Sequence, residues 1–421
     1  MKVLIRKATI VSPSSPFHGQ TLDILIDEGF ISAIEKDINK KADDVIERDN
    51  MHVSLGWADC FANFCDPGYE FKETLVSGSM AAATGGFTQI MLIPNTNPVI
   101  GNKGQVEYMK QKEVVVPVDI LPIGSITKNI EGKELSEMYD MFTSGAVAFS
   151  DGQNPVQSSG ILQKALEYVL TIDATVIQLP DDKSISPTGL MNESIISTQL
   201  GLPGKPALAE ELMIARDIEL VKYTGSKIHF TGISSAKSLE LIAAAKKEKL
   251  RVTCSVSPYH LFFCEEDLTT YDTNLKVNPP LRSKTDRNAL RKGIRNGTVD
   301  FIASHHQPQN WDNKICEFEY AKNGMETLES VFGAALASGV SFETFVQMQT
   351  ENVRQIFKIF APKIEIDAIA HITMFNPAKE YIFEESDIFS QSKNNAFVGK
   401  KLKGTIYGTM QGKKIFRKRI K

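Results

Sequence analysis

The stretch GWADCFANFCDPG, residues 56–68, has the pattern of a buried strand that runs into a loop. Apolar and small side chains dominate its first half, and Asp-Pro-Gly at its end is typical of a turn. Seven further apolar runs of similar character follow along the chain. They cover residues 86–94, 118–126, 146–151, 174–180, 227–234, 251–258 and 299–306.

Helical patterns separate most of these runs. They lie at residues 72–85, 133–145, 158–173, 205–225 and 236–250, and several end in glycine or lysine, as helix C-termini commonly do. Eight alternating strand–helix units predict an α/β fold with a (β/α)8 barrel of the TIM type. An open doubly wound sheet is the alternative, but no glycine-rich phosphate-binding loop follows any of the strands.

Both ends of the chain are rich in β-strand patterns. KVLIRKATIVS and LDILIDEGFISAIEKD occur near the start, and AHITMFNPAKEYIF and GKKLKGTIYGTMQGKKIF occur near the end. We expect these ends to pair in one small domain. The predicted organisation is a composite β-sandwich of residues 1–52 and 367–421 around a barrel of residues 53–366.

The composition narrows the class of protein. The chain has 421 residues and a net charge of -4, which argues against nucleic acid as a partner, and we read the basic tail of residues 413–421 as a solvated terminus. Five cysteines without a CxxC pair favour free thiols in a reducing compartment. With no secretory signal and no apolar run long enough to cross a membrane, the expected location is the cytoplasm.

In a TIM-type barrel, chemistry takes place at the C-terminal ends of the strands. Several loops at those ends carry recognisable motifs: DPGYEFKETL (residues 66–75), PNTNPV (94–99), GLPGKPALAEE (201–211) and KVNPPLR (276–282). In this order they resemble dihydroorotase, a cyclic amidohydrolase of the metal-dependent amidohydrolase superfamily. The layout, with β-rich ends that flank a barrel, is similar over nearly the whole chain.

The resemblance implies a defined chemistry. The family interconverts N-carbamoyl-aspartate and dihydroorotate in pyrimidine biosynthesis. One or two zinc ions, held by four histidines and an aspartate, generate a hydroxide and polarise the amide. A carboxylate moves the proton.

This chain departs from the family at each of those positions. The histidines of the first strand match Phe61 and Asn63, and an arginine that clamps the substrate carboxylate matches Cys65. The histidines of two later strands match Gln178 and Gly232, and the catalytic aspartate matches His305. Phenylalanine and glycine provide no metal ligand, so we expect no zinc and no other cofactor.

A few functional positions survive. Asp151 matches a bridging aspartate, and His306 keeps a histidine of the last motif, whose final histidine is Gln309 here. Asn95 and Asn278 match residues that hydrogen-bond the substrate in the family, although an asparagine at a strand end also serves as a cap or turn residue. A shifted metal site would have to use His305, Asp151 and Asp59.

Three functions remain open. The first is a catalytically inactive homologue with a structural role, as a noncatalytic partner of aspartate carbamoyltransferase; the resemblance suggests this role and a homodimer or larger oligomer. The second is an active cyclic amidohydrolase with an altered or relocated metal site. The third is a small-molecule binding module that uses the old pocket.

Overall fold

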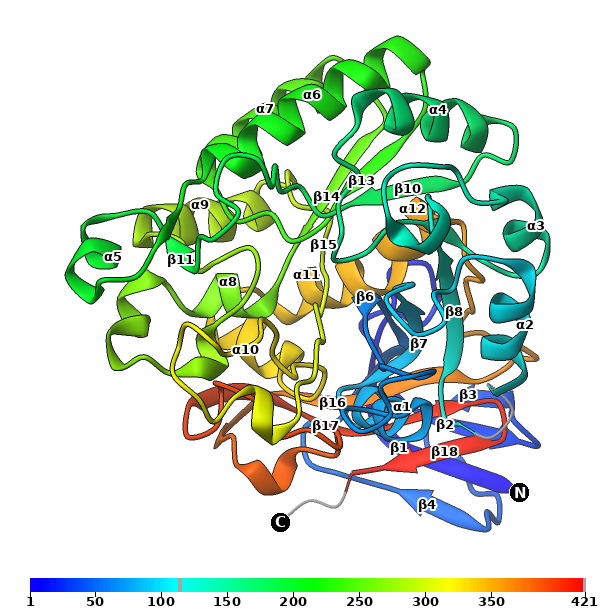
Figure 1. Ribbon diagram of the computed structural model, residues 1–421. Helices are drawn as coiled ribbons and strands as arrows, with labels where there is room; N and C mark the ends of the chain where they lie inside the picture. Colours follow the sequence, from blue (N-terminus) through cyan, green and yellow to red (C-terminus); the bar gives the residue numbers. More distant parts are fainter. Residues whose placement is uncertain (113–115, 419–421) are drawn as a thin grey trace.

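The computed structural model describes residues 1–112 and 116–418 and contains a barrel and a separate sheet (Figure 1). Each of the eight predicted strand segments contains a strand, and these strands pair in parallel in chain order, from β6 to β15. Their bounds are β6 Trp57–Ala62, β7 Phe87–Leu92, β8 Asp119–Gly124, β9 Ala148–Phe149, β10 Thr175–Gln178, β13 Ile228–Phe230, β14 Val252–Val256 and β15 Phe301–Ile302. The predicted (β/α)8 architecture is confirmed, and the open doubly wound sheet is excluded as a description.

Helices cover the outside of the barrel. The longer ones are α1 Leu75–Thr84, α2 Lys103–Lys112, α4 Ser159–Leu170, α6 Leu208–Thr224, α7 Ala236–Lys247 and α9 Lys284–Arg295. Shorter α-helices are α3 Met138–Thr143, α5 Ile195–Leu200, α8 Pro258–Phe262, α10 Val331–Ala337, α11 Phe342–Gln347 and α12 Val353–Phe357. The loops add the short pair β11 Met191–Asn192 and β12 Gly204–Lys205, the 3-10 turns η2 Lys128–Ile130, η3 Glu265–Thr270, η4 Thr273–Leu275, η5 Trp311–Asn313 and η7 Glu385–Asp387, and the π-helical turn η6 Met348–Asn352.

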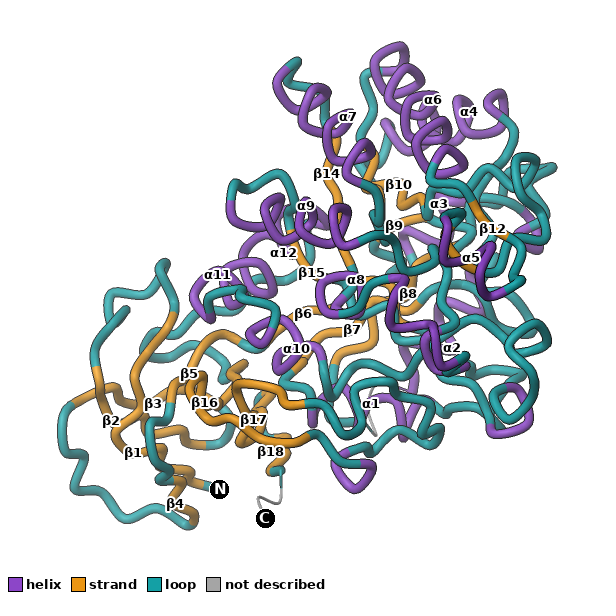
Figure 2. Tube along the Cα trace, turned by 90° about the vertical axis from the view of Figure 1, so that its left-hand side faces the viewer, coloured by secondary structure: helices purple, strands orange, loops and turns teal. Residues whose placement is uncertain are grey.

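The two chain ends share one mixed sheet, as expected. Its strands are β1 Lys2–Val11, β2 Thr21–Asp27, β3 Phe30–Glu35, β4 Asp44–Ile46, β5 His52–Leu55, β16 His371–Ile382, β17 Lys401–Gln411 and β18 Lys414–Arg417. The N-terminal and C-terminal halves join where β5 pairs antiparallel with β16. The strands nearest the two ends of the described chain, β1 and β18, belong to this sheet, which lies below the barrel in Figure 1 and at the lower left in Figure 2. The proposed domain boundaries at 52/53 and 366/367 stay a prediction.

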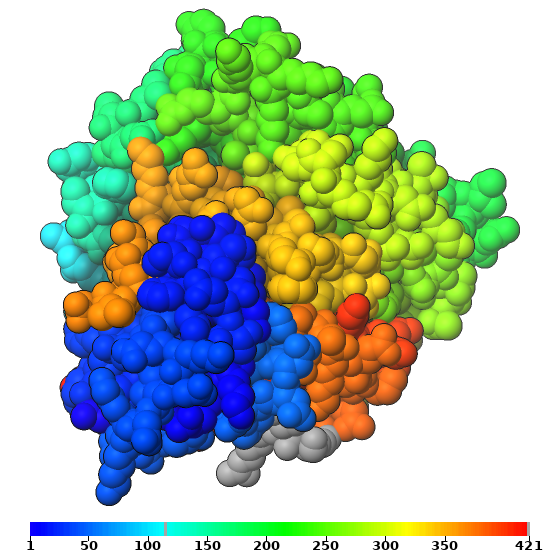
Figure 3. Space-filling model, turned by 180° about the vertical axis from the view of Figure 1, so that it is seen from behind, coloured from blue at the N-terminus to red at the C-terminus, as the bar shows by residue number. Residues whose placement is uncertain are grey.

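The barrel and the sheet meet at an aromatic cluster around Trp57. Its indole lies with ring centroids 4.9 Å from Phe332, 5.0 Å from Phe345 and 5.6 Å from Phe375 of β16. These side chains are buried, so the contact adds apolar burial to the backbone pairing. Seen from behind, N-terminal residues lie directly against the C-terminal part of the chain (Figure 3), and Ser15 Oγ donates to the carbonyl of Ile364.

The basic tail, the cysteines and the helix lengths can each be located in the structure. Part of the basic tail forms the edge strand β18, whereas residues 419–421 lie outside the described part of the chain. All five cysteines are free thiols. Over residues 1–112 and 116–418, no helix has both the length and the apolar character that crossing a membrane requires.

In the described structure no hydrogen-bonded ladder joins β6 and β15. Side-chain and loop contacts close the barrel between these two strands. The Asp59 carboxylate accepts hydrogen bonds from Ser304 N at 2.7 Å and Ser304 Oγ at 2.6 Å. Just beyond the strands, Asn63 N donates to the carbonyl of His306 at 2.9 Å. Asp59 is fully buried, and this burial raises the pKa of its carboxyl to about 7, against the opposing effect of the Ser304 hydrogen bonds.

Replacing Asp59 by alanine should destabilise the protein, because the Ser304 amide and hydroxyl then lose their acceptor in a buried place. We expect a loss of about 2–4 kcal/mol in the free energy of unfolding, measured by urea denaturation. Asp59→Asn keeps an acceptor for the amide and should cost less. The exposed Asp140 of α3 offers a matched control, Asp140→Asn, with no expected change. An Asp59→Ala variant as stable as the wild type would contradict the role of Asp59 in closing the barrel.

A comparison of the wild type with Asp59→Asn at different pH values tests the protonation state of Asp59. The raised pKa of Asp59 means that the folded protein holds a proton that the unfolded chain releases near the ordinary pKa of 3.8. The stabilisation of the folded state by this proton is therefore complete below that pH, and it is lost as the pH rises towards about 7. Relative to Asp59→Asn, the wild type should lose up to about 1.4 kcal/mol per pH unit across this window. Parallel pH dependences for the two proteins would show that Asp59 ionises normally.

Candidate functional site

Phe61 and His305 meet at the C-terminal end of the barrel, where the two ends of the strand series come together. Both side chains are buried, and their ring centroids are 4.8 Å apart. The backbone turns sharply at both residues, with φ of 75° for Phe61 and 48° for His305. His305 Nε2 lies 2.8 Å from Thr231 Oγ1, and burial lowers the pKa of His305 to about 3, so the imidazole is neutral.

Gly232 lies directly against this histidine. Its φ is +69°, and a Cβ atom at this position would lie 2.8 Å from His305 Cε1 and 2.9 Å from Leu179 Cδ1. Both the backbone conformation and the lack of space favour glycine. The interior next to His305 is therefore closed by packing against Gly232.

Gln178 lies elsewhere, although the resemblance matched it to a lumen histidine. Its side-chain amide accepts from Val156 N at 3.3 Å and donates towards Asp217 Oδ2 of α6 at 3.4 Å. The next residue, Leu179, is the one that approaches the Gly232 and His305 pair. Because neighbouring residues of a strand face opposite sides, a shift by one position changes which side chain enters the barrel.

A chain of polar side chains continues from His305 into the barrel. Thr231 Oγ1 lies 3.0 Å from Ser255 Oγ, which lies 2.9 Å from His229 Nε2, and His229 Nδ1 lies 2.9 Å from Thr253 Oγ1. Burial lowers the pKa of His229 well below its ordinary value. Hydroxyls and neutral imidazoles each donate and accept, so the chain satisfies itself without an ion.

The loop after β6 holds the other two first-strand positions. Asn63 Oδ1 accepts a hydrogen bond from Cys65 N at 2.8 Å, which makes Asn63 part of a local turn. Cys65 is buried, and burial raises the pKa of its thiol to about 12. Neither the asparagine nor this neutral thiol provides the positive charge of the arginine that the family has at the Cys65 position.

His306 faces away from His305, as expected for neighbouring residues. Its Nδ1 accepts from Thr327 N at 3.2 Å, and its Nε2 lies 3.5 Å from Glu73 Oε2. Two more carboxylates, Glu326 and Glu329, are buried in the same region. Burial, followed by the neighbouring Glu329, raises the pKa of Glu326 well above its ordinary value, so this group holds a proton.

Asp151 is bound to backbone and hydroxyl groups. Its carboxylate accepts from Ile126 N and Thr127 N, both at 2.9 Å, and from Thr127 Oγ1. Burial raises the pKa of Asp151 to about 6. Asp151, Asp59 and His305 therefore each have their own separate partners.

The two matched asparagines also bind protein groups. Asn95 Nδ2 donates to the carbonyl of Asp151 at 3.4 Å, and Asn95 Oδ1 accepts from Gln153 N at 3.1 Å. Asn278 Oδ1 accepts from Lys205 Nζ at 2.9 Å. Lys205 also forms a 2.6 Å ion pair with Asp181, and this group borders a cavity of about 330 Å³.

Lys205 and Asp181 were missed by the sequence reasoning. Lys205 belongs to the quoted GLPGKPALAEE motif, and Asp181 comes shortly after β10, which ends at Gln178. The place of Asp181 shortly after a barrel strand was the one available signal, and it did not indicate the partner Lys205, which lies on the separate pair of β11 and β12. The cluster of Glu73, Glu326 and Glu329 had no comparable signal, because the last two lie far from the first in sequence.

The side chains around His305 differ from those of a zinc site. Phe61 and Thr231 lie against His305 and Leu179 lies beside Gly232, and this set does not fit the nitrogen, sulfur or carboxylate donors that zinc takes. Across residues 1–112 and 116–418, no three or more His, Cys, Asp or Glu side chains are arranged so that they could hold a metal ion.

Known proteins provide an independent comparison. Residues 53–238 match the family described as "Dihydro-orotase-like". The chain is 38% identical to a dihydroorotase of Syntrophus aciditrophicus over 424 residues, covering 99% of each chain. It is 37% identical to a dihydroorotase of Acetivibrio thermocellus over 425 residues, covering 99% of this chain and 100% of that one.

Solved structures support the fold. The L-hydantoinase (dihydropyrimidinase) of Arthrobacter aurescens superposes with a TM-score of 0.84 at 22% identity, over 100% of this chain and 96% of that chain. The dihydropyrimidinase of Brevibacillus agri gives 0.81 at 20% identity, over 99% and 95%. At this identity the match concerns the architecture, whereas the identity to the dihydroorotases over the full length shows that the chain belongs to the dihydroorotase family.

Proposed function

We propose that this member of the dihydroorotase family is catalytically inactive, binds no zinc, and serves as a noncatalytic partner of an aspartate carbamoyltransferase. The observation that carries the first part is the packing at His305. Phe61 lies on one side of the imidazole, and Gly232 leaves no room on another. A ligand side chain at Gly232 would require this packing to open.

The protonation states support the same proposal. A lumen imidazole with a pKa of about 3 is a weak base near neutral pH, and His305 stands where the resemblance implies the catalytic aspartate. The polar chain behind it is complete in hydrogen bonds. The retained Asp151 is bound to the 126–127 backbone and offers no proton route to His305 through the contacts that the structure describes.

The structural role draws support from what is intact. The barrel, the shared terminal sheet and the buried contacts between them are all formed in this chain, although the matched positions are substituted. A partner interface requires a stable surface and not a metal site. A carbamoyltransferase that precedes the family's reaction and makes its substrate is the partner that the resemblance suggests, and a homodimer or larger assembly is part of the same proposal.

The packing at Gly232 can be tested with a glycine of nearly equal backbone conformation. Gly225 has a φ of +68° but no atom within 4 Å of its added Cβ. Gly232→Ala should therefore destabilise the protein by about 1–3 kcal/mol more than Gly225→Ala in thermal or urea unfolding. His305→Ala should relieve part of this excess. Equal losses for the two glycine variants would show that the space beside His305 is not closed.

Metal content tests inactivity without relying on a lack of turnover. Purified protein that was expressed with zinc in the medium should contain far less than one zinc ion per chain by mass spectrometry of metals. A catalytic dihydroorotase, such as the Syntrophus relative, serves as the parallel control. The protein should also fail to open the dihydroorotate ring under conditions in which the control is active. Stoichiometric zinc, or turnover abolished by a chelator, would overturn the proposal.

The partner role predicts a stable complex. Co-expression with the aspartate carbamoyltransferase of the same organism should give a single species in size-exclusion chromatography with light scattering. Its mass should correspond to a complex that contains whole numbers of both chains. The Gly225→Ala variant, which leaves the buried site unchanged, should form the complex as well as the wild type. Separate elution of the two proteins at micromolar concentration would reject this partner while leaving the prediction on zinc untouched.

A further inference from the structure

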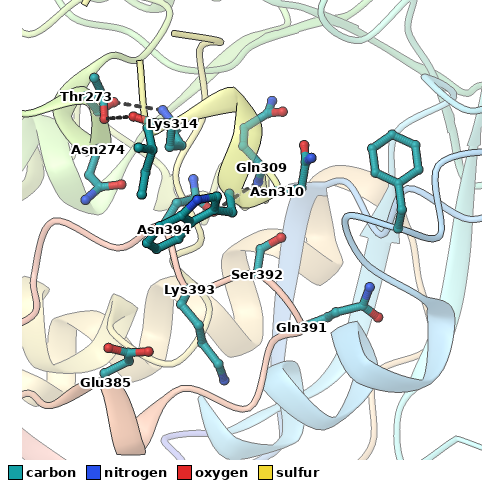
Figure 4. A pocket seen from close by; sticks show the side chains of 13 residues that line it. Thr273, Asn274, Gln309, Asn310, Lys314, Glu385, Gln391, Ser392, Lys393 and Asn394 are labelled. Atoms are coloured by element: carbon teal, nitrogen blue, oxygen red, sulfur yellow. Dashed lines mark hydrogen bonds between the residues drawn. The ribbon is translucent and has the colours of Figure 1, made fainter. Parts of the chain in front are cut away.

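A cavity of about 400 Å³ opens beside the barrel mouth, apart from the packed site at His305 (Figure 4). Three segments that are distant in sequence build it: the loop after β6, the loops around η4 and η5, and the C-terminal segment of residues 385–394. Its volume lies in the range of small-molecule sites. Of the positions matched to metal ligands, only Gln309 contributes to its wall.

Exposed aromatic rings line this cavity. Trp311 is 72% exposed and Phe71 is 59% exposed, although large aromatic side chains are usually much more buried. Phe71 makes a ring contact with Tyr69, on its own loop. The two rings come from different loops and border one hollow. Lys72 Nζ lies 5.8 Å from the centre of the Phe71 ring, so the more exposed Trp311 offers the better stacking surface. Aromatic faces stack well on nucleobases, whatever the base.

Amide side chains surround the rings. Asn274, Gln309 and Asn310 line the cavity; in Figure 4, Gln309 and Asn310 lie next to each other, and Asn274 lies apart from them near Thr273. Gln309 is committed to the fold, because its Nε2 donates to the carbonyl of Asn323. The Asn274 side-chain amide makes no hydrogen bond to any described residue, and it offers a donor beside an acceptor. This is the pattern that complements the polar edge of a base.

Cationic groups lie in an adjoining cavity of about 550 Å³, which shares Phe71, Gln309 and Asn310 with the first. Lys72 and Lys322 line it, and neither forms an ion pair with a described residue. Lys72 Nζ lies 5.5 Å from the centre of the Tyr69 ring. With Asp312 as the one carboxylate in this wall, the local charge is positive although the chain carries -4 in total.

We propose that these joined cavities bind a nucleoside phosphate, with the base against Trp311 and Phe71 and the phosphate beside Lys72 and Lys322. The rings supply stacking, Asn274 reads the base edge, and the two ammonium groups attract the phosphate. The site goes beyond the proposed partner role, because it neither requires the carbamoyltransferase nor uses the packed residues around His305.

The chain provides its own reporter for this proposal. It has two tryptophans, and Trp57 is fully buried in the aromatic cluster, whereas Trp311 borders the cavity. Titration of the full chain with uridine 5′-monophosphate or adenosine 5′-monophosphate should quench tryptophan emission with saturation. Uridine should bind more weakly because it lacks the phosphate, and inorganic pyrophosphate should not quench. Absence of saturable quenching with both nucleotides, or equal affinity for uridine and its phosphate, would overturn the proposal.

Variants locate the site by calorimetry with the same nucleotides. Trp311→Ala should weaken binding by about 5- to 150-fold, the range expected for loss of one stacked base. Lys322→Ala should weaken it less and reduce its dependence on salt. Tyr223→Ala on α6 removes an aromatic ring that is 76% exposed and lies outside this cavity, and serves as the matched control. Circular dichroism checks that each variant folds. Unchanged affinity in Trp311→Ala, or an equal loss in Tyr223→Ala, would contradict the assignment.

Discussion

The Asp59 carboxylate holds the first and last strands of the barrel series together. A parallel barrel needs its end strands to meet, and here β6 and β15 do so without a hydrogen-bonded ladder in the described chain. Both oxygens of Asp59 are taken by Ser304, one by the amide and one by the hydroxyl. Burial makes a carboxylate costly, and the two Ser304 donors offset this cost only in part, so the pKa of Asp59 stays raised. The arrangement at His305 follows, because Ser304 immediately precedes it.

The barrel interior is stabilised in a way that suits neutral groups. Ionised carboxylates buried here without a metal would leave a charge unpaired, at a cost of several kcal/mol. Here the same region contains the Phe61 ring, the neutral His305 and a hydrogen-bonded chain from Thr231 through Ser255 and His229 to Thr253. The substitutions are mutually compatible. The His305 side chain has room because Gly232 has no side chain, and the Phe61 ring packs against the His305 imidazole.

Sequence reasoning predicted the eight strands and the pairing of the two ends, because apolar runs with turn residues depend mainly on local pattern. It was less successful in predicting which side chains meet in the barrel interior. Gln178 and Leu179 are neighbours in one run, and only their register decides that Leu179 lies beside Gly232 while Gln178 turns towards Asp217. The Lys205 and Asp181 pair depends on how two loops fold over the barrel mouth, which no spacing along the chain encodes.

The buried carboxylates behind His306 connect the closed interior with the open mouth. Glu329 accepts hydrogen bonds from the amides of Phe389 and Ser390, and Glu326 accepts from Asn395 at 2.7 Å. The C-terminal segment is thereby fixed to the barrel on both sides of residues 391–394, which line the aromatic cavity. A loop whose backbone is held at several points loses little entropy when a ligand arrives. The mouth of this barrel is therefore preorganised, although its centre is filled, and binding there needs no movement of the packed strand ends.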